Sequence, residues 1–158
     1  MEHQVTAKPT VDENRVVQLL IDLCRADSAP LKEKNVFDLV FAAMQELGFS
    51  VREDDAAAKI GGQVGNIIAT KPGKGRGVHA EPLMFSAHMD RVAGGIGVKP
   101  QLVDGVIKSD GTTILGADDA AGLAAVIEAC RVLVESDMDH PPLEVVFTVA
   151  EEIGLLGA

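Results

Sequence analysis

Apolar residues recur at intervals of three and four positions in three segments of the chain, which is the spacing of amphipathic helices. Thr10 and Glu13 stand in capping-box register before the first segment, Pro30 precedes the second, and Gly48 offers the second a stop. The third segment follows Asp119. The apolar faces of the expected helices are Val16, Leu19, Leu20, Leu23 and Cys24; Val36, Leu39, Val40, Ala43 and Leu47; and Leu123, Val126, Ile127, Cys130 and Val134. The sequence therefore predicts three helices that each bury one face.

Shorter apolar segments between and after these helices indicate strands. The expected strands are residues 49–52, 66–70, 83–87 and 143–149. The run 83–87 is almost continuously apolar, which is typical of a central parallel strand. Asp104 and Gly105, between two short apolar pairs, predict a hairpin turn. The order of helices, strands, crossover helix and strand predicts a single α/β domain with a partly parallel sheet.

Charge and composition exclude several classes of function. The net charge of −10 argues against a nucleic-acid partner, because binding a phosphate backbone relies on clusters of Lys and Arg. No apolar run reaches the ~18 residues of a membrane span, and residues 1–4 do not begin a secretory signal. Cys24 and Cys130 occupy apolar helix positions, so we expect both to be reduced core residues. These features together favour a cytoplasmic protein with no membrane partner.

Acidic residues and one histidine follow three of the strand-like segments. Glu151 and Glu152 end the last strand, where an unpaired buried carboxylate would be very costly. His88 and Asp90 follow the run 83–87 and, being two residues apart, face the same side. The pair of aspartates at residues 118–119 follows a third apolar lead-in. Because ligands gather at the carboxyl ends of strands in open α/β sheets, these groups predict a shared metal site.

Each group also has a plain structural explanation. One residue of the pair Asp118 and Asp119 could simply cap the third helix, and Glu151 and Glu152 could be a solvated acid pair. We interpret the remaining histidines as surface residues: His3, His79 and His140. The convergence of all three groups favours the metal site, in which a metal-held water loses a proton to a carboxylate.

Three segments of the chain resemble the di-zinc peptide hydrolases that include peptidase T and glutamate carboxypeptidase, and the peptidase T (tripeptide aminopeptidase) branch most. The segments that carry this resemblance are Ser86–Asp90, Ile114–Gly122 and Phe147–Ala158. The resemblance implies a zinc-exopeptidase-like three-layer sandwich. It also implies metal-dependent hydrolysis of the amino-terminal peptide bond of short peptides, which would be the substrate.

The resemblance further implies a role for each candidate residue. His88 would bind one zinc ion and Asp90 would orient the ring of His88. Asp118 would bridge both metal ions and be followed by a cis peptide bond, and Glu152 would bind the other metal ion. Glu151 would be the general base. Zn²⁺ is the expected ion, with two per complete site and Co²⁺ or Mn²⁺ as alternatives.

The chain departs from the family pattern at a few positions. Arg91 replaces the usual Thr and Ala120 the common Lys, which we expect to alter substrate contacts without removing a ligand. Family members continue past the position of Ala158 with another acidic ligand, a lid domain and a final His ligand. We therefore expect residues 1–158 to be the N-terminal segment of one catalytic domain, inactive alone and without the lid and dimerisation domain. A homodimer of the full-length protein remains open.

Other functions stay open at this point. The chain could be a non-catalytic metal-binding or assembly module, or belong to an acyl-amino-acid amidohydrolase or dipeptidase of the same family. A dinucleotide-binding oxidoreductase is disfavoured, because neither glycine cluster, 61–65 or 94–97, has the required spacing between a strand and a helix.

Overall fold

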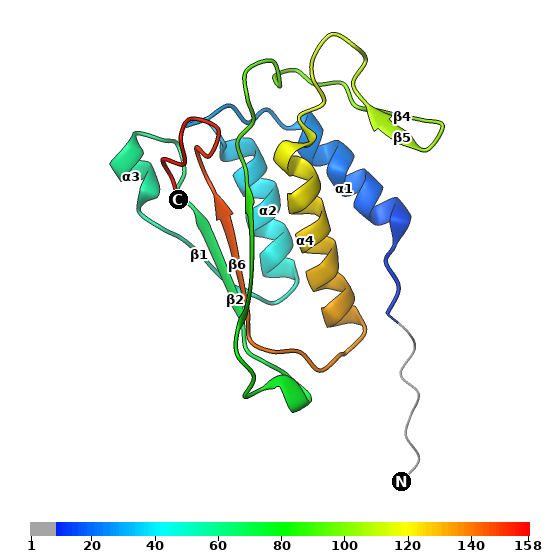
Figure 1. Cartoon of the computed structure of the whole chain (residues 1–158), viewed down its shortest axis with the longest axis vertical. Coiled ribbons are helices and arrows are strands. Elements are labelled where there is room, and N and C mark those ends of the chain that lie inside the picture. The colour runs from blue at the N-terminus through cyan, green and yellow to red at the C-terminus, as the bar shows by residue number, and fades with distance from the viewer. Residues whose placement is uncertain (1–8) are drawn as a thin grey trace.

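A four-stranded sheet with helices against one face organises the computed structural model, which describes residues 9–158 (Figure 1). The elements are α1 (Glu13–Arg25), α2 (Lys34–Glu46), β1 (Ser50–Glu53), α3 (Ala56–Ile60), β2 (Ile67–Lys71), the 3-10 helix η1 (Gly75–Gly77), β3 (Leu83–His88), β4 (Gln101–Val103), β5 (Val106–Lys108), α4 (Ala117–Glu135) and β6 (Leu143–Thr148). Helices α2 and α4 lie against the sheet, and α1 packs against α4 (Figure 1).

The sheet mixes antiparallel and parallel pairing in the order β1-β2-β6-β3. β2 is antiparallel to both β1 and β6, whereas β3 runs parallel to β6. His88, the last residue of β3, pairs with Thr148, the last residue of β6. The residues that follow these two strands therefore leave the sheet at the same edge. The predicted α/β fold with a partly parallel sheet is confirmed.

Alternating burial along β6 shows which face of the sheet carries the core. Leu143, Val145 and Phe147 are buried, whereas Glu144, between two of them, is exposed. The buried residues join Ile67 of β2 and the inner faces of α2 and α4 in one apolar cluster. This period of two is the pattern of a sheet with one face packed on the core.

β3 is parallel to β6 as predicted, but within residues 9–158 it lies at the edge of the sheet rather than in its centre. Within residues 9–158, no strand pairs with the outer edge of β3. Leu83 and Met84 are accordingly 46% and 61% exposed. The apolar run indicated a strand correctly, but its neighbours are decided by tertiary pairing that periodicity does not encode.

The helices agree with the predicted segments in type but differ at their starts. The N-cap of α1 is Asp12, whose side chain accepts from the amide of Arg15, rather than Thr10. α2 begins at Lys34 instead of near Pro30, because Leu31 adopts a left-handed conformation with φ of 67°. On α2, Leu39 is exposed, and Phe37 and Met44 are buried in addition to the predicted positions. The short helix α3 was not predicted.

Other sequence-based expectations have mixed outcomes. Cys24 and Cys130 are buried free thiols, and the hairpin of β4 and β5 forms around Asp104 as predicted. His140 is only 5% exposed, so its interpretation as a surface residue is wrong; its Nδ1 donates to the carbonyl oxygen of Pro141. The prediction for His3 lies outside the described residues. In residues 9–158, no helix has both the length and the apolar character that crossing a bilayer requires.

Candidate metal centre

His88 ends β3 with its imidazole close to three acidic residues. Its Nδ1 donates to the main-chain oxygen of Asp90 at 2.9 Å and lies 3.5 Å from the carboxylate of Asp90. Its Nε2 lies 3.1 Å from the Asp118 carboxylate and 4.0 Å from that of Glu151. Because contacts to Asp90 hold Nδ1, the outward nitrogen Nε2 is the one that can bind a ligand.

Asp90 connects the ends of β3 and β6. Its side chain is fully buried, and its two carboxylate oxygens accept the backbone amides of Glu151 (2.9 Å) and Glu152 (3.0 Å). Burial works to raise the pKa of Asp90, but the contact with His88 and the two amides outweigh it and lower the pKa. Asp90 is therefore an ionised buried group that fixes both the histidine and the turn after β6.

Asp118 and Asp119 occupy the first residues of α4 and do different things. Their φ and ψ angles are not helical, and a cis peptide bond joins them, as the family resemblance implied. Asp119 accepts from the amide of Gly122 at 3.0 Å, which is the helix-capping role considered for this pair. The Asp118 side chain is 87% exposed and faces His88.

His88, Asp118 and Glu152 together form a group that could hold a metal ion. One ligand atom from each lies within 4.8 Å of the others. An imidazole nitrogen with two carboxylate oxygens is a donor set that Zn²⁺ and related divalent ions accept. The geometry thus brings together the three residues predicted as ligands, which come from the ends of β3 and β6 and the start of α4.

Charges around the group fit a cation. Partial burial, and then the nearby acids Asp118, Glu151 and Asp90, raise the pKa of Glu152 against the opposing effect of His88. The hydrogen bond with Asp90, helped by Asp118 and opposed by burial, raises the pKa of His88 to about 9. Without metal, a protonated His88 partly balances the acids. A metal ion would take over this role and displace the proton, since only neutral imidazole is a ligand.

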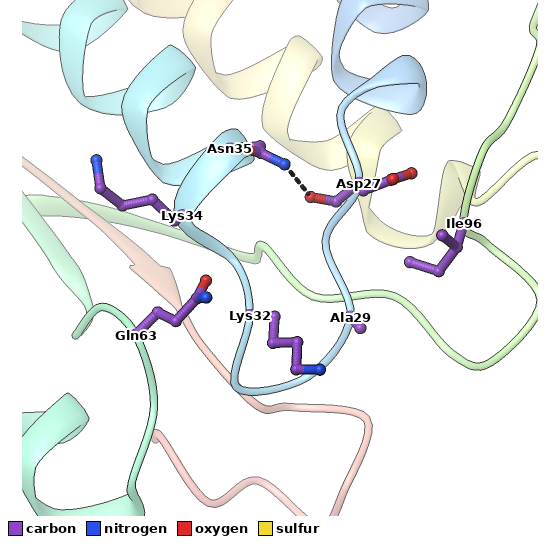
Figure 2. A pocket seen from close by; sticks show the side chains of 7 residues that line it. All are labelled: Asp27, Ala29, Lys32, Lys34, Asn35, Gln63 and Ile96. Atoms are coloured by element: carbon purple, nitrogen blue, oxygen red, sulfur yellow. Dashed lines mark hydrogen bonds between the residues drawn. The ribbon is translucent and has the colours of Figure 1, made fainter.

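Two pockets lie near the loop between α1 and α2, and one of them reaches the candidate centre. The pocket in Figure 2, of about 470 Å³, contains none of the candidate ligands. It is lined by Asp27, Ala29, Lys32, Lys34, Asn35, Gln63 and Ile96, and its rim is closed by a hydrogen bond from Asn35 to the main-chain oxygen of Asp27. A second pocket, of about 410 Å³, is bordered by Glu152 and by the apolar side chains of Pro30, Val92, Ile96 and Ile153.

Arg91 follows Asp90 in sequence, but its guanidinium binds the end of α1 rather than the candidate ligands. Its side chain is buried, and its guanidinium donates to the carbonyl oxygens of Leu23, Cys24 and Ala26 at the end of α1. A cation at a helix C-terminus is stabilising because those carbonyls carry partial negative charge. Arg91 therefore anchors α1. Because it also lines the pocket beside Glu152, the expectation that it alters substrate contacts stays a prediction.

Sequence reasoning missed three buried residues that support the centre. Ser28 donates to the main-chain oxygen of Met89 at 2.7 Å, and Glu33 and Asn66 accept amides of residues next to Glu151. Ser28 lies in a loop, Glu33 just before α2 and Asn66 just before β2. Each has a polar residue or a glycine as a neighbour, so nothing in the local sequence marked it as buried.

Residues 66–158, which contain the whole candidate centre, match peptidase family M28. The chain belongs to peptidase family M28. Among relatives, the uncharacterized protein YqjE of Bacillus subtilis is 41% identical over 94% of this chain and 39% of its own length. The chain therefore spans well under half of the length of that relative.

Solved structures agree with the sequence relatives. The crystal structure of the aminopeptidase PepT from Bacillus cereus matches with a TM-score of 0.88 and 41% identity, over 93% of this chain and 39% of that one. A tripeptidase from Staphylococcus aureus matches with a TM-score of 0.87 and 37% identity over the same shares. These similarities confirm the predicted resemblance to peptidase T.

Proposed function

We propose that this chain contributes to the active site of a zinc-dependent aminopeptidase that cleaves the amino-terminal bond of short peptides. One observation carries the proposal: a ring nitrogen of His88 and carboxylate oxygens of Asp118 and Glu152 lie within 4.8 Å of one another, and the carboxylate of Glu151 is 4.0 Å from Nε2 of His88. The names of the similar solved proteins, an aminopeptidase and a tripeptidase, support the substrate class.

Each residue would have a separate task. His88, Asp118 and Glu152 would hold zinc, which lowers the pKa of a bound water and polarises a carbonyl. Asp90 would keep Nδ1 of His88 protonated, so that Nε2 carries the lone pair toward the metal. Asp90 binds the backbone amide of Glu151, and the Glu151 side chain is 35% exposed. This carboxylate would take a proton from the water and pass it to the departing amine.

The complete site would need more than these residues. A catalytic zinc ion typically has about three protein ligands and one open position, so three residues cannot fill two such sites. We therefore propose that further ligands and the surfaces that read the peptide ends come from outside residues 1–158. The apolar pocket beside Glu152 would receive a side chain of the peptide. A cytoplasmic location, with neither nucleic acid nor membrane as a partner, stays part of this proposal.

The test replaces Glu151 by Gln in the full-length protein that contains this chain. We expect hydrolysis of a tripeptide such as trialanine to fall by at least about a hundredfold, because the general base is lost. Zinc content, measured by atomic absorption, should stay unchanged because Glu151 is not a proposed ligand. An unchanged rate in Glu151→Gln would exclude Glu151 as the base. A wild-type protein that binds zinc without hydrolysing peptides would support a non-catalytic module instead.

A further inference from the structure

The four backbone amides from Val149 to Glu152 each donate to a buried side chain from another part of the chain. Val149 donates to Asn66 at 2.9 Å, and Ala150 donates to Oε1 of Glu33 at 3.1 Å. The next two amides donate to the carboxylate of Asp90. Asp90 also contacts His88, whereas the hydrogen bonds of Glu33 go to the amides of Leu31 and Ala150.

Glu33 is placed in an unusual environment for a carboxyl group. Glu33 has no exposed surface, and its Oε1 also accepts a hydrogen bond from the amide of Leu31 at 2.7 Å. Its second oxygen, Oε2, is buried without a hydrogen-bond partner. Burying a carboxyl group in this way costs free energy, so we expect its hydrogen bonds to stabilise a particular conformation.

The conformation that Glu33 stabilises is that of Ala150, whose amide donates to it. Ala150 is fully buried and adopts a left-handed conformation with φ of 53°, which is unfavourable for a residue with a Cβ atom. This backbone angle turns the chain sharply out of β6 immediately before Glu151. The amide of Ala150 donates to Glu33 in this conformation.

We propose that Glu33 is a positioning residue of the candidate centre, which holds Ala150 in its left-handed turn and thereby aims Glu151 and Glu152. This inference rests on the proposed function, because Glu151 and Glu152 matter only as base and ligand. Burial, with a smaller contribution from Asp90, raises the pKa of Glu33 against the effect of the amides, so a neutral side chain with a carbonyl oxygen suits the position.

The first experiment measures amide hydrogen exchange by NMR in the metal-free 158-residue chain. We expect Glu33→Met to speed exchange at Ala150, Glu151 and Glu152 by about tenfold, the effect of one lost hydrogen bond. Glu33→Gln keeps the carbonyl oxygen and should restore slow exchange. Unchanged exchange at these amides in Glu33→Met would overturn the proposal. If Glu33→Met does not fold, the shortened Glu33→Asp makes the same test.

The matched control is Glu128→Met, which removes the other buried glutamate. Glu128 is 3% exposed and accepts from Arg15 and from the amide of Asp12, away from the turn after β6. Its loss should leave exchange at residues 150–152 no faster than the change in overall stability requires. If Glu128→Met accelerates these amides as much as Glu33→Met does, Glu33 acts through general stability and the proposal fails.

The second experiment titrates the same proteins with cobalt(II) chloride and follows the visible absorption of the bound ion. Glu33→Met should weaken Co²⁺ binding by about 10–100-fold and change the spectrum, as loss of groups that orient ligands does. Wild-type affinity and spectrum in Glu33→Met would overturn the positioning role. Absence of Co²⁺ binding in the wild type would instead count against the proposed metal site, while the exchange rates would still decide whether Glu33 holds the turn.

Discussion

Asp90 accepts hydrogen bonds from three residues through its buried side chain and its main-chain carbonyl. Its main-chain oxygen accepts from His88, and its carboxylate accepts the amides of Glu151 and Glu152. Since a carboxylate is an acceptor at both oxygens, no neutral side chain of the same shape can satisfy both amides. Asp90 is therefore the residue at which the histidine and the glutamates of the candidate centre depend on each other.

Replacing Asp90 by Asn should weaken metal binding more than it weakens the fold. The amide nitrogen of Asn would face a backbone donor, and His88 would lose its charged neighbour. We expect Zn²⁺ affinity, measured by calorimetric titration, to fall by about 10–100-fold. The free energy of unfolding without metal should fall by about 1–3 kcal/mol, the cost of an unsatisfied buried group.

Asp104→Asn is the matched control for that change. Asp104 is exposed at the β4–β5 turn with φ of 52°, a conformation that Asn adopts readily. It should leave both quantities unchanged. Equal Zn²⁺ affinity in Asp90→Asn and wild type would mean that Asp90 does not orient a ligand.

At the scale of elements, an ion pair fastens α1 to α4. Glu128 is buried on α4 and accepts from Nε and a terminal nitrogen of Arg15 on α1, at 2.9 and 2.7 Å. Arg15 also contacts Glu135, about two turns further along α4. The ends of α1 are thus held by Arg15 near its start and by Arg91 at its last turn, which keeps the following loop against the candidate centre.

Glu128→Gln should lower the free energy of unfolding by about 1.5–3 kcal/mol near pH 7, the worth of hydrogen bonds to a charged group. The contact with Arg15 outweighs burial and lowers the pKa of Glu128 below its ordinary value of 4.5. A lowered pKa stabilises the fold above pH 4.5 and the benefit disappears as pH falls through the folded-state pKa. Urea denaturation at several pH values should show the difference between wild type and variant shrinking below pH 4.5. A difference independent of pH would contradict the assignment to the ionised pair.

Elements could be predicted from local spacing, but their starts and neighbours could not. The apolar stripes of α1, α2 and α4 are periodic along the chain, and the pattern identified all three. The start of α2 depends on the turn at Leu31, whose amide is held by the side chain of Glu33. Within residues 9–158, β3 has β6 as its one neighbour in the sheet. Which strands pair is decided by tertiary structure and not by local spacing.

At the scale of the whole molecule, the candidate centre gathers negative charge that the fold alone does not balance. Asp118, Glu151 and Glu152 approach His88 in a protein whose net charge is already −10. A ligand that binds only the folded state stabilises it in proportion to the logarithm of its concentration. Metal binding should therefore be visible as stability even where no peptide is cleaved.

Zinc should reverse the effect of Glu152→Gln on stability relative to wild type. In EDTA, removing one crowded charge should leave the variant as stable as wild type or more stable by less than about 1 kcal/mol, since Glu152 is partly exposed. With Zn²⁺ at a hundred times its dissociation constant, wild type should gain about 2.7 kcal/mol and the variant less. Thermal denaturation measures both.

Glu144→Gln makes the same change on the exposed face of β6 and should respond to zinc as wild type does. An equal zinc effect in Glu152→Gln and wild type would remove Glu152 from the ligand set.

The candidate ligands could be predicted because strand ends in such sheets meet at one edge, whereas their supports could not. His88, Asp118 and Glu152 each follow a recognisable apolar run. Glu33 and Asn66 act on amides 117 and 83 positions away, so nothing in their local sequence marks them. Their role exists only once the two ends of the chain segment have come together.

The position of β6 also sets the order in which the molecule can be completed. β6 follows β1, β2 and β3 in sequence, yet it lies between β2 and β3. A ribosome therefore exports β1, β2 and β3 before the strand that joins them exists, and the sheet stays in two unconnected parts until residues 143–148 emerge. Such long-range closure is slow, so the nascent protein needs protection from aggregation until then.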